Sequence, residues 1–502
     1  MSNFQVTSND ISTIAAQARK AQSEWALLSY GQRAKHIKKI GPYLGRHVDE
    51  LVETVHKDNG KLKYDILSTE ILSAVMSLSY YISNGKKFMR STGIGLGCIL
   101  MFNKISRMVY KPFGVIGIIT PWNFPLAIPF SEVVMALLAG NAVILKTASN
   151  TVNVGRALAA IFEAADLPKG LFNYVEIKGE EAGRAFIDGG VDKIFFTGSA
   201  KTGKELAALA APRLLPLVLE LGGADAAVIC ADANLDKAAK GIIWAGFSSA
   251  GQICGGIQRV LVYKSVYEKF LKKLSILVEK LRVGDDLDSD VGPLVNERQK
   301  QKFKEQIDAC ISGGAKIAAK SQGGDLNDQT LFAPALVLTD VKNSMPVMTE
   351  EIFGPVVAVI PVDDAACAIS IANDSPYGLS GSVWSANHTR AKKIALQINA
   401  GSVMINDHLM SYALAETPWG GFGDSGIGRT HGKIGFQEML KAQVVVDDIL
   451  PFSKRSLVWQ PYSKKLYKGV RAIVSFLSGP SLFNRIAAVP GVMGIFFRYW
   501  KK

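Results

Sequence analysis

Cysteine is scarce in this 502-residue chain. It occurs five times at irregular spacing, as Cys98, Cys230, Cys254, Cys310 and Cys367. No two cysteines have the close spacing of a metal cluster or a redox pair, so we expect no metal site. A secreted protein held by disulfides uses more cysteines, which favours a reducing compartment. The first ten residues lack the basic and apolar runs of a secretory signal, so the cytoplasm is the expected location.

Acidic residues are absent from the C-terminal tail. Residues 453–502 contain no Asp or Glu but ten Lys and Arg, and they therefore supply most of the net charge of +13. The preceding body of the chain is nearly neutral. A nucleic-acid-binding protein would carry a basic face on its folded body, so we expect no nucleic-acid partner.

The composition is that of an ordinary folded protein, with 48% hydrophobic and 20% charged residues. A chain of this length forms two or more domains. Residues 10–90 show the three- and four-residue apolar spacing of helices. From about residue 126 onward, strand-like runs alternate with helical stretches, and a second such series covers residues 257–410. This alternation predicts an α/β fold with two domains built on parallel sheets.

The basic tail also has an apolar side. Between residues 464 and 477, apolar residues recur at helical spacing on one face and basic residues on the other, which is typical of a helix that binds an anionic membrane surface. A second apolar run, 486–497, is too short to span a bilayer. We predict peripheral contact with the cytoplasmic face of a membrane. The alternatives are packing on a neighbouring subunit and partial disorder.

A candidate nucleophile lies in the stretch GQICGGIQR, residues 251–259. A lone cysteine is most often a small apolar core residue. The glycines around Cys254, however, leave room for a ligand and for backbone N–H groups. A nucleophilic thiol also needs a base or a lowered pKa. Glu220 ends an apolar run before two glycines, where burial would raise its pKa toward neutrality; the alternative is a surface Glu at a strand edge.

Asn123 is the candidate oxyanion donor. It lies in PWNFP, residues 121–125, where two prolines and two aromatic residues predict a rigid turn. Its amide N–H₂ would stabilise a developing oxyanion. The alternative is an Asn that satisfies the backbone of its own turn.

Three further stretches suit a nucleotide. FFTGSAKTGKEL, residues 195–206, combines a strand, a glycine turn and a helix start, which together favour a phosphate group. Lys146 ends a strand in VILKTASN, where it would contact a ribose or phosphate, although a solvated surface Lys is the alternative. Glu351 and Phe353 precede a Gly-Pro turn in EEIFGPV and offer a carboxylate and a ring to a nucleoside.

These motifs together resemble the aldehyde dehydrogenase superfamily. PWNFP, Lys146, FTGS with Gly203, ELGG, GQICGGIQR, EEIFGPV and PWGGFGDSGIGR follow one another in the family's order over roughly residues 110–430. The resemblance implies that Cys254 is the nucleophile, Glu220 the general base and Asn123 the oxyanion amide. Family members that transfer the acyl group to coenzyme A typically lack this base, so Glu220 favours hydrolysis to a free acid.

The resemblance also implies a cofactor site for NAD or NADP. Its expected residues are Trp122, Lys146, Ser149, Gly179, Gly198, Ser199, Gly203, Glu351 and Phe353. Many NAD-preferring members carry an acidic residue where this chain has Ser149. An acidic residue there repels a 2′-phosphate, so its replacement leaves both cofactors open.

The substrate is less constrained. Family members specific for succinate semialdehyde place an Arg eight residues after the catalytic Asn, where this chain has Ser131. An uncharged residue favours an apolar aldehyde of medium or long chain, or an aromatic one. Succinate semialdehyde or another small polar aldehyde is the alternative.

The family resemblance implies a three-part architecture and a tail. A dinucleotide-binding domain is expected at 1–95 and 113–222, a catalytic domain at 223–432, a β-strand oligomerisation arm at 96–112 and 433–450, and the basic amphipathic tail at 451–502. Such arms pair between subunits, which implies a homodimer or homotetramer.

Overall fold

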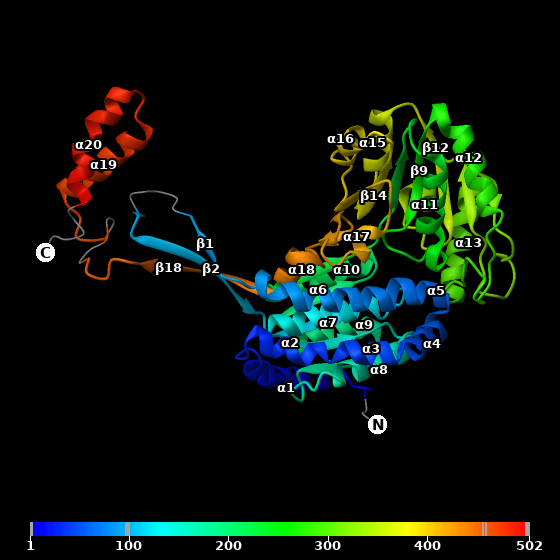
Figure 1. The fold of residues 1–502 in the computed structure, drawn as a ribbon, viewed down its shortest axis with the longest axis horizontal. Coiled ribbons are helices and arrows are strands. Elements are labelled where there is room, and N and C mark those ends of the chain that lie inside the picture. Colours follow the sequence, from blue (N-terminus) through cyan, green and yellow to red (C-terminus); the bar gives the residue numbers. More distant parts are fainter. Residues whose placement is uncertain (1–3, 96–100, 454–455, 457–458, 497–502) are drawn as a thin grey trace. The chain divides into compact units, whose positions relative to one another are not determined.

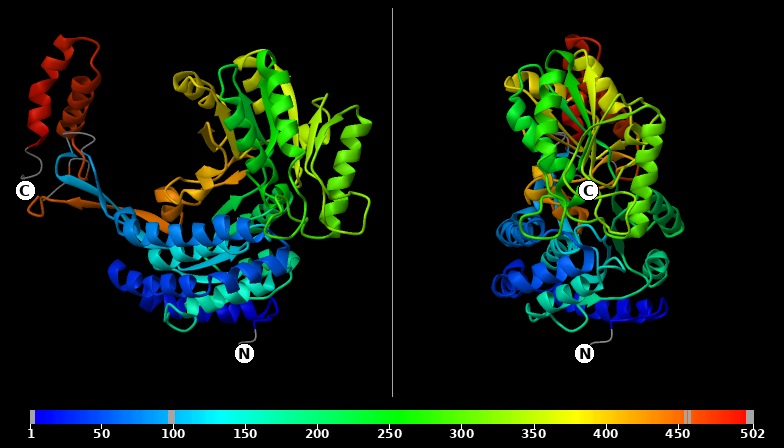
Figure 2. Two further views of the ribbon diagram at one scale, coloured as in Figure 1. Left: turned by 45° about the vertical axis from the view of Figure 1, so that its right-hand side comes forward. Right: turned by 90° about the vertical axis from the view of Figure 1, so that its right-hand side faces the viewer.

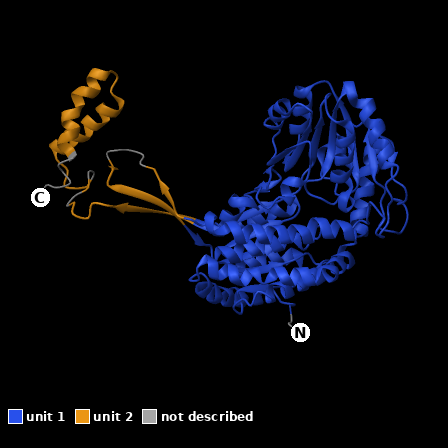
Figure 3. Ribbon diagram, viewed as in Figure 1, with its two compact units in different colours: residues 1–90, 110–441 blue, residues 91–109, 442–502 orange. Residues whose placement is uncertain are grey.

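The protein is described by a computed structural model that covers residues 4–95, 101–453, 456 and 459–496. The chain divides into two compact units, which are coloured separately in Figure 3. Unit 1 comprises residues 1–90 and 110–441, and unit 2 comprises residues 91–109 and 442–502. Cys98, which belongs to the predicted arm, lies outside the described residues.

Helices form the start of unit 1 and alternate with strands after it (Figure 1). The helices of unit 1 are α1 (Asp10–Trp25), α2 (Tyr30–Lys38), α3 (Ile40–Arg46), α4 (Val48–Asn59), α5 (Lys63–Ile66), the π-helical η1 (Leu67–Ile71), α6 (Leu72–Phe88), α7 (Ala127–Ala139), α8 (Val152–Glu163), α9 (Gly179–Asp188), α10 (Ala200–Ala210), η3 (Ala211–Arg213), α11 (Leu235–Phe247), η4 (Ser248–Gly251), α12 (Lys264–Val278), α13 (Glu297–Ser312), α14 (Pro346–Thr349), α15 (Ala365–Asn373), α16 (His388–Ala395), α17 (Met410–Ala413) and α18 (Gly432–Glu438).

A six-stranded sheet carries the first half of unit 1. Its order is β17 (Gly426–Ile427), β7 (Leu217–Glu220), β6 (Lys193–Thr197), β3 (Val115–Ile119), β4 (Ala142–Lys146) and β5 (Phe172–Tyr174). All neighbouring strands run parallel except β17, which is antiparallel to β7. Every residue of β3 and β4 is buried, as expected for central parallel strands that helices cover on both faces.

A seven-stranded sheet carries the second half. Its order is β10 (Lys316–Lys320), β11 (Leu336–Thr339), β12 (Val356–Val362), β9 (Ile257–Tyr263), β8 (Asp225–Ile229), β14 (Ser380–Trp384) and β15 (Ser402–Ile405), and only β10 is antiparallel to its neighbour. A small ladder joins β13 (Tyr377–Gly378) to β16 (Phe422–Gly423).

Alternate side chains of β8 belong to different cores. Ala227 and Ile229 pack with α11, α12 and α13, whereas Ala226 and Val228 pack with α15 and α16. Successive strand residues point to opposite faces, so one short apolar run supports two helical layers. Figure 2 shows these layers on the two sides of the sheet. The predicted α/β class with two parallel sheets, and the predicted helices within 10–90, are confirmed.

The helical stretch Lys63–Phe88 is the one described segment whose length and apolar character would suffice to cross a membrane. In this fold it is a core element, because Ile66, Ile71 and Tyr81 are at most 3% exposed and α6 packs against α7. Leu482–Ile495 is similarly apolar but shorter.

Unit 2 contains a three-stranded sheet and a helical hairpin. The sheet has the order β1 (Thr92–Ile94), β2 (Lys104–Pro112) and β18 (Leu440–Asp448). The hairpin pairs α19 (Lys464–Ser478) with α20 (Leu482–Phe496). Gly469 meets Ile495 and Ala472 meets Gly491, so the two helices run antiparallel.

The hairpin corrects one prediction about the tail. The apolar residues of 464–477 were expected to form a single free face. Instead, Leu466 and Ile473 are 7% exposed and pack with Val492 and Ile495 of α20, because a helix beside another helix buries its nearest apolar row. The remaining apolar residues of α19 stay exposed.

Two helical glycines provide a matched test of packing in unit 1. A Cβ on Gly155 of α8 would lie 2.2 Å from the Tyr174 ring, whereas a Cβ on Gly45 of α3 would have nothing within 4 Å. We expect Gly155→Ala to lower the free energy of unfolding by about 1–3 kcal/mol through overpacking. Gly45→Ala should raise it by about 0.5–1 kcal/mol through helix propensity. Urea unfolding of both variants measures the difference, and equal effects would contradict the close packing at Gly155.

Candidate active site

A cavity of about 200 Å³ collects most of the predicted site residues. It is lined by Pro121, Trp122, Asn123, Thr197, Gly198, Ser199, Glu220, Leu221, Gly222, Cys254, Gln299, Lys302, Glu351 and Phe353. Eight of the twelve predicted residues are among them. The other four, Lys146, Ser149, Gly179 and Gly203, are not.

The cavity lies at the carboxyl ends of parallel strands. Thr197 ends β6, Glu220 ends β7, and the turn with Trp122 and Asn123 follows β3. In open α/β sheets, ligands bind beyond the carboxyl ends of the strands, where loops from adjacent strands meet. The alternation of strands and helices therefore brings residues about a hundred positions apart to one edge.

Cys254 reaches the cavity from the loop between η4 and β9. Three successive residues before it, Ser249, Ala250 and Gly251, have positive φ angles of 50°, 55° and 70°. Two of these are not glycine, and this conformation is strained for residues with a Cβ. The surrounding fold therefore holds the loop in a conformation that it would not adopt alone.

The glycines of this loop also permit close packing against neighbouring segments. They were predicted to leave room around the sulfur. A Cβ on Gly251 would lie 2.3 Å from the Gly354 carbonyl oxygen, and one on Gly255 would lie 2.8 Å from the Trp419 ring. These glycines thus let a neighbouring backbone and a ring approach the cysteine loop closely.

Asn123 is linked directly to the cysteine loop. Its Nδ2 donates a 2.9 Å hydrogen bond to the carbonyl oxygen of Gln252, two residues before Cys254. The amide therefore bonds across the site rather than to its own turn. This bond uses one N–H and fixes the plane of the amide, which leaves the second N–H for a ligand in the cavity.

Glu220 is buried, at 5% exposure, and neither carboxyl oxygen has a hydrogen bond of ordinary geometry. The alternative of a surface Glu is therefore wrong. Burial raises the pKa of Glu220 well above its usual value, and the nearby charge of Glu132 raises it further. Arg429 and the Thr430 backbone N–H act on this pKa in the opposite direction. A carboxylate whose pKa is raised in this way is a stronger base than an exposed one.

The Cys254 thiol is held in its protonated form. Burial raises its pKa first, followed by the negative charges of Glu351, Glu220 and Asp225, while the Gly255 N–H lowers it. Removal of the proton therefore requires a base beside the sulfur, and Glu220 lines the same cavity.

Glu351 and two rings occupy another part of the cavity wall. Glu351 Oε1 accepts a 3.3 Å hydrogen bond from the Gly223 N–H, and burial raises the pKa of this carboxyl to about 7. A Cβ on Gly222 would lie 2.3 Å from Glu351 Oε2, so a larger residue there would displace the Glu351 carboxyl. The Trp122 and Phe353 rings meet edge to face with centroids 5.4 Å apart.

Ser199 and Gly203 lie in different surroundings although they share one motif. Ser199 caps α10, and its Oγ accepts a 3.2 Å hydrogen bond from the Thr202 N–H. The first-turn N–H groups of this helix provide an anion site beside the cavity. Gly203 lies inside α10, where a Cβ would come within 2.5 Å of Leu221. Its observed role is close helix packing.

Lys146 and Gly179 lie together outside the cavity lining. Lys146 is 5% exposed, so the alternative of a solvated Lys is wrong. Burial lowers its pKa to about 8, and its ammonium has no acidic partner among the residues that the structure describes. A Cβ on Gly179, the first residue of α9, would lie 3.4 Å from Lys146 Nζ. Ser149 is exposed in the turn before α8.

These groups fit a dinucleotide. A buried cation without a counterion favours an oxygen-rich ligand, a helix N-terminus favours phosphate, and a carboxylate suits ribose hydroxyls. Lys146, Ser199 and Glu351 supply these three groups.

Sequence reasoning missed several residues of the site. Gln299 and Lys302, both in α13, line the cavity, and Gln299 Nε2 donates a 2.7 Å hydrogen bond to the Phe353 carbonyl. Nothing in their local sequence marks them. Gly222 could have been found, because the adjacent glycines after Glu220 indicate a close approach of the backbone.

Comparison with known proteins agrees with this geometry. Residues 3–445 match the sequence model of the aldehyde dehydrogenase family. The chain is 34% identical over 465 residues to a 4,4'-diapolycopene aldehyde oxidase of Methylomonas sp, which covers 92% of this chain and 86% of that protein. It is also 34% identical to a Mycobacterium ulcerans (strain Agy99) protein provisionally named succinate-semialdehyde dehydrogenase, NADP(+), over 88% of this chain and 84% of that protein.

A solved structure is also similar to this chain in sequence and in fold. The NAD+ complex of an aldehyde dehydrogenase from Bacillus cereus superposes with a TM-score of 0.83 at 32% identity, covering 89% of this chain and 90% of that one. The match extends over nearly all of the chain in both sequence and fold. The predicted resemblance is thereby confirmed, and the chain belongs to the aldehyde dehydrogenase family.

Proposed function

We propose that the protein oxidises an apolar aldehyde to the carboxylic acid with NAD+ or NADP+ as the oxidant. The observation that carries this proposal is the meeting of Cys254, Glu220, Asn123 and Glu351 in one cavity. The cavity thereby brings together a thiol, a carboxyl of raised pKa proposed as the base, an amide donor and a carboxylate proposed to bind ribose.

In the first step, Cys254 Sγ bonds to the carbonyl carbon of the aldehyde while Glu220 takes the thiol proton. The carbonyl π electrons move to oxygen, and the resulting oxyanion accepts hydrogen bonds from Asn123 Nδ2 and the Cys254 backbone N–H. The raised pKa of Glu220 suits this transfer, because a weaker acid is a stronger base.

The cofactor would be held by residues already described. Lys146 would contact the adenine ribose, Ser199 and Gly198 the pyrophosphate, and Glu351 the nicotinamide ribose. When bound, NAD+ or NADP+ supplies the hydride acceptor that converts the cysteine adduct to a thioester. The exposed Ser149 places no negative charge against a 2′-phosphate, so we propose that both cofactors are accepted.

Glu220 acts again in the second step, after its first proton has passed to solvent. It takes a proton from a water molecule whose oxygen attacks the thioester carbon. The C–S bond breaks, the acid leaves, and Cys254 regains a proton. The sum is aldehyde, NAD(P)+ and water giving acid, NAD(P)H and one proton.

The substrate is proposed to be apolar because the uncharged Ser131 stands where succinate-semialdehyde-specific family members carry an Arg. Ser131 and Glu132 are both buried in α7, and Glu132 is close enough to affect the pKa of Glu220. Burial raises the pKa of Glu132 to about 8, and α7 offers no cation that could pair with a carboxylated aldehyde. The Methylomonas relative is named for a polyene aldehyde, which agrees with this preference. The mycobacterial relative's name favours the alternative, succinate semialdehyde.

The substrate class can be tested with unbranched aldehydes of increasing length and with succinate semialdehyde. Each methylene that becomes buried contributes about 0.8 kcal/mol, so kcat/KM should rise severalfold per carbon until the pocket is filled. The measurement is steady-state NADH or NADPH formation with purified protein. A higher kcat/KM for succinate semialdehyde would overturn the apolar assignment.

Glu220→Gln removes the base of both proposed steps. First-turnover NADH formation and hydrolysis should each slow by about 10²–10⁴-fold. Because a base works only when deprotonated, wild-type turnover should be lost as pH falls through the raised pKa of Glu220, and the variant should lose this acidic limb. Stopped-flow NADH formation against pH measures both effects. Exposed Glu180→Gln is the control, and an unchanged variant profile would exclude Glu220 as the base.

We further propose that unit 2 contacts other surfaces. Val444, Val445 and Val446 on β18 are 48–58% exposed, and β18 is an edge strand of its sheet. An exposed β-branched edge favours pairing with a second copy of the chain. This supports the expected homodimer or homotetramer.

The helical hairpin is proposed to lie on an anionic lipid surface at the cytoplasmic side. Two rows of exposed apolar side chains run along it at three- and four-residue spacing: Tyr467, Val470, Val474 and Leu477 on α19, and Leu482, Ile486, Val489 and Met493 on α20. In an antiparallel pair with the observed buried residues, this spacing places both rows on the same side of the hairpin.

Charge favours lipid as the occupant of this face. Lys464, Lys468 and Arg471 are exposed on α19 away from its apolar row, and the tail contains no acidic residue. A basic amphipathic surface binds anionic headgroups with its charges while apolar side chains enter the acyl boundary. The four reduced cysteines among the described residues also suit the cytoplasmic side.

Vesicle flotation tests the lipid face with Val474→Asp/Ile486→Asp. The wild type should float with phosphatidylcholine vesicles that contain phosphatidylglycerol, and binding of the variant should fall about tenfold or more because two charges enter the apolar face. Ser475→Asp/Ala487→Asp changes the charge equally on the opposite side and should retain most binding. If the wild type stays unbound and the first variant alone lowers the mass measured by light scattering, the face is a subunit interface instead.

A further inference from the structure

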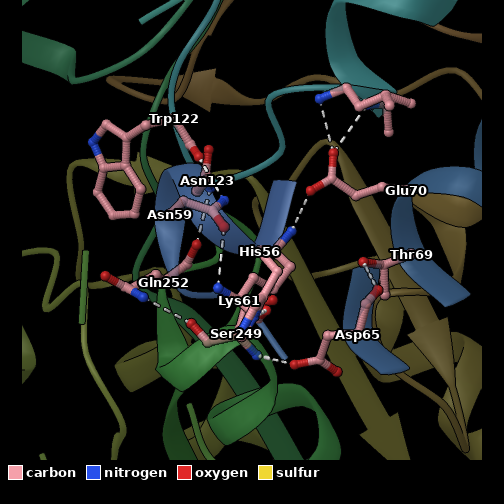
Figure 4. Close-up of polar contacts among 12 residues, drawn as sticks. His56, Asn59, Lys61, Asp65, Thr69, Glu70, Trp122, Asn123, Ser249 and Gln252 are labelled. Atoms are coloured by element: carbon pink, nitrogen blue, oxygen red, sulfur yellow. Dashed lines mark hydrogen bonds and ion pairs between the residues drawn. The ribbon is translucent and has the colours of Figure 1, made fainter. Parts of the chain in front are cut away.

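The segment Asn59–Glu70 buries polar groups that do not line the active-site cavity. Asn59, Lys61, Asp65 and Glu70 are all at most 9% exposed. Burying such groups costs several kcal/mol unless each finds a partner, so their contacts indicate what the segment does. All four contact the two loops that carry the proposed catalytic residues, or contact one another (Figure 4).

Two of these residues hold the ends of the turn that contains Asn123. Asn59 Nδ2 donates a 3.1 Å hydrogen bond to the carbonyl oxygen of Trp122, immediately before Asn123. Glu70 Oε2 accepts from the N–H groups of Leu126 and Ala127 at 2.9 and 3.1 Å. These N–H groups belong to the start of α7 and have no partner within the helix.

Lys61 connects the two contacts. Its Nζ lies 2.7 Å from Glu70 Oε1, and its backbone N–H donates to Asn59 Oδ1 at 3.0 Å. The same ammonium lies 3.7 Å from the centroid of the Phe124 ring, inside the turn. A buried ion pair of this kind fixes its surroundings because both charges lose much if they separate.

Asp65 extends the segment to the cysteine loop. Its Oδ2 accepts a 2.8 Å hydrogen bond from the N–H of Ser249, one of the residues held at positive φ. Gln252 Nε2 donates to the Ser249 carbonyl at 3.0 Å, and the Gln252 carbonyl accepts from Asn123. The hydrogen bonds thus connect Asn59, the turn, the cysteine loop and Asp65 (Figure 4).

We propose that Asn59, Asp65 and the Lys61–Glu70 pair are positioning residues that hold the Asn123 amide against the Cys254 backbone. This inference rests on the proposed role of Asn123 as oxyanion donor. Neither loop sets the spacing by itself, since the turn and the cysteine loop come from different sheets. A third segment that bonds to both fixes the oxyanion position relative to the nucleophile.

Positioning through Asn123 differs from general structural support in a measurable way. If Asn59 acts through Asn123, Asn59→Ala should slow the first turnover only while the Asn123 amide is present. A displacement of catalytic groups by about 1 Å can cost on the order of 10²-fold, and loss of one clamp should cost about tenfold. In an Asn123→Ala background, Asn59→Ala should change the rate less than about twofold.

The experiment is stopped-flow NADH formation in the wild type, both single variants and the double variant. Asn173→Ala, which removes a 2.8 Å bond to the Gly170 carbonyl away from the cavity, is the matched control and should be neutral. The rate of Cys254 alkylation by iodoacetamide reports on the nucleophile without the oxyanion hole. It should be unchanged in Asn59→Ala.

The outcomes separate the alternatives. An equal loss from Asn59→Ala in both backgrounds, or no loss in either, overturns the positioning role. A fall in alkylation equal to the fall in first turnover also overturns it, because the cysteine loop itself is then displaced. If Asn123→Ala matches the wild type in first turnover, it is the proposed oxyanion role of Asn123 that fails.

Discussion

Burial of ionisable groups in a small cavity is the constraint on which the rest of the site depends. Cys254, Glu220 and Glu351 share this space, and burial is the largest cause of the raised pKa of each. Burial disfavours the charged form of each group, so a Glu220 carboxylate formed there readily takes up a proton. This is the property that the proposed base requires.

The backbone around the cavity has to be brought unusually close to hold these groups. Gly222 approaches the Glu351 carboxyl, and Gly251 approaches the Gly354 backbone. Ser249, which has a positive φ angle, is bonded by Asp65 through its N–H and by Gln252 through its carbonyl. A distant helical segment thus contributes a hydrogen bond to the strained part of the cysteine loop.

The two units differ in how far they bury their apolar side chains. The parallel sheets of unit 1 are covered on both faces, whereas the hairpin of unit 2 has a small apolar core that includes Leu466, Ile473, Val492 and Ile495. Most apolar side chains of the hairpin therefore stay exposed. This exposed surface and the ten basic residues of the tail are the basis of the proposed contact with an anionic lipid surface.

The sequence by itself determined the α/β class, the helical start and the residues at strand ends. Near-continuous apolar runs such as those of β3 and β4, alternating with helices, are typical of covered parallel sheets. The order of motifs was enough to indicate the family and to single out Cys254, Glu220 and Asn123. Local pattern sufficed because each feature is encoded within a few neighbouring residues.

Tertiary structure decided how these residues meet. The cavity position of Gln299, the contact of Gly203 with Leu221 and the bond between Asn123 and Gln252 each join segments distant in the chain. The division of the α19 apolar residues into a buried and an exposed row also required α20 to be in place. No local pattern records such contacts, because packing selects them only after both elements have formed.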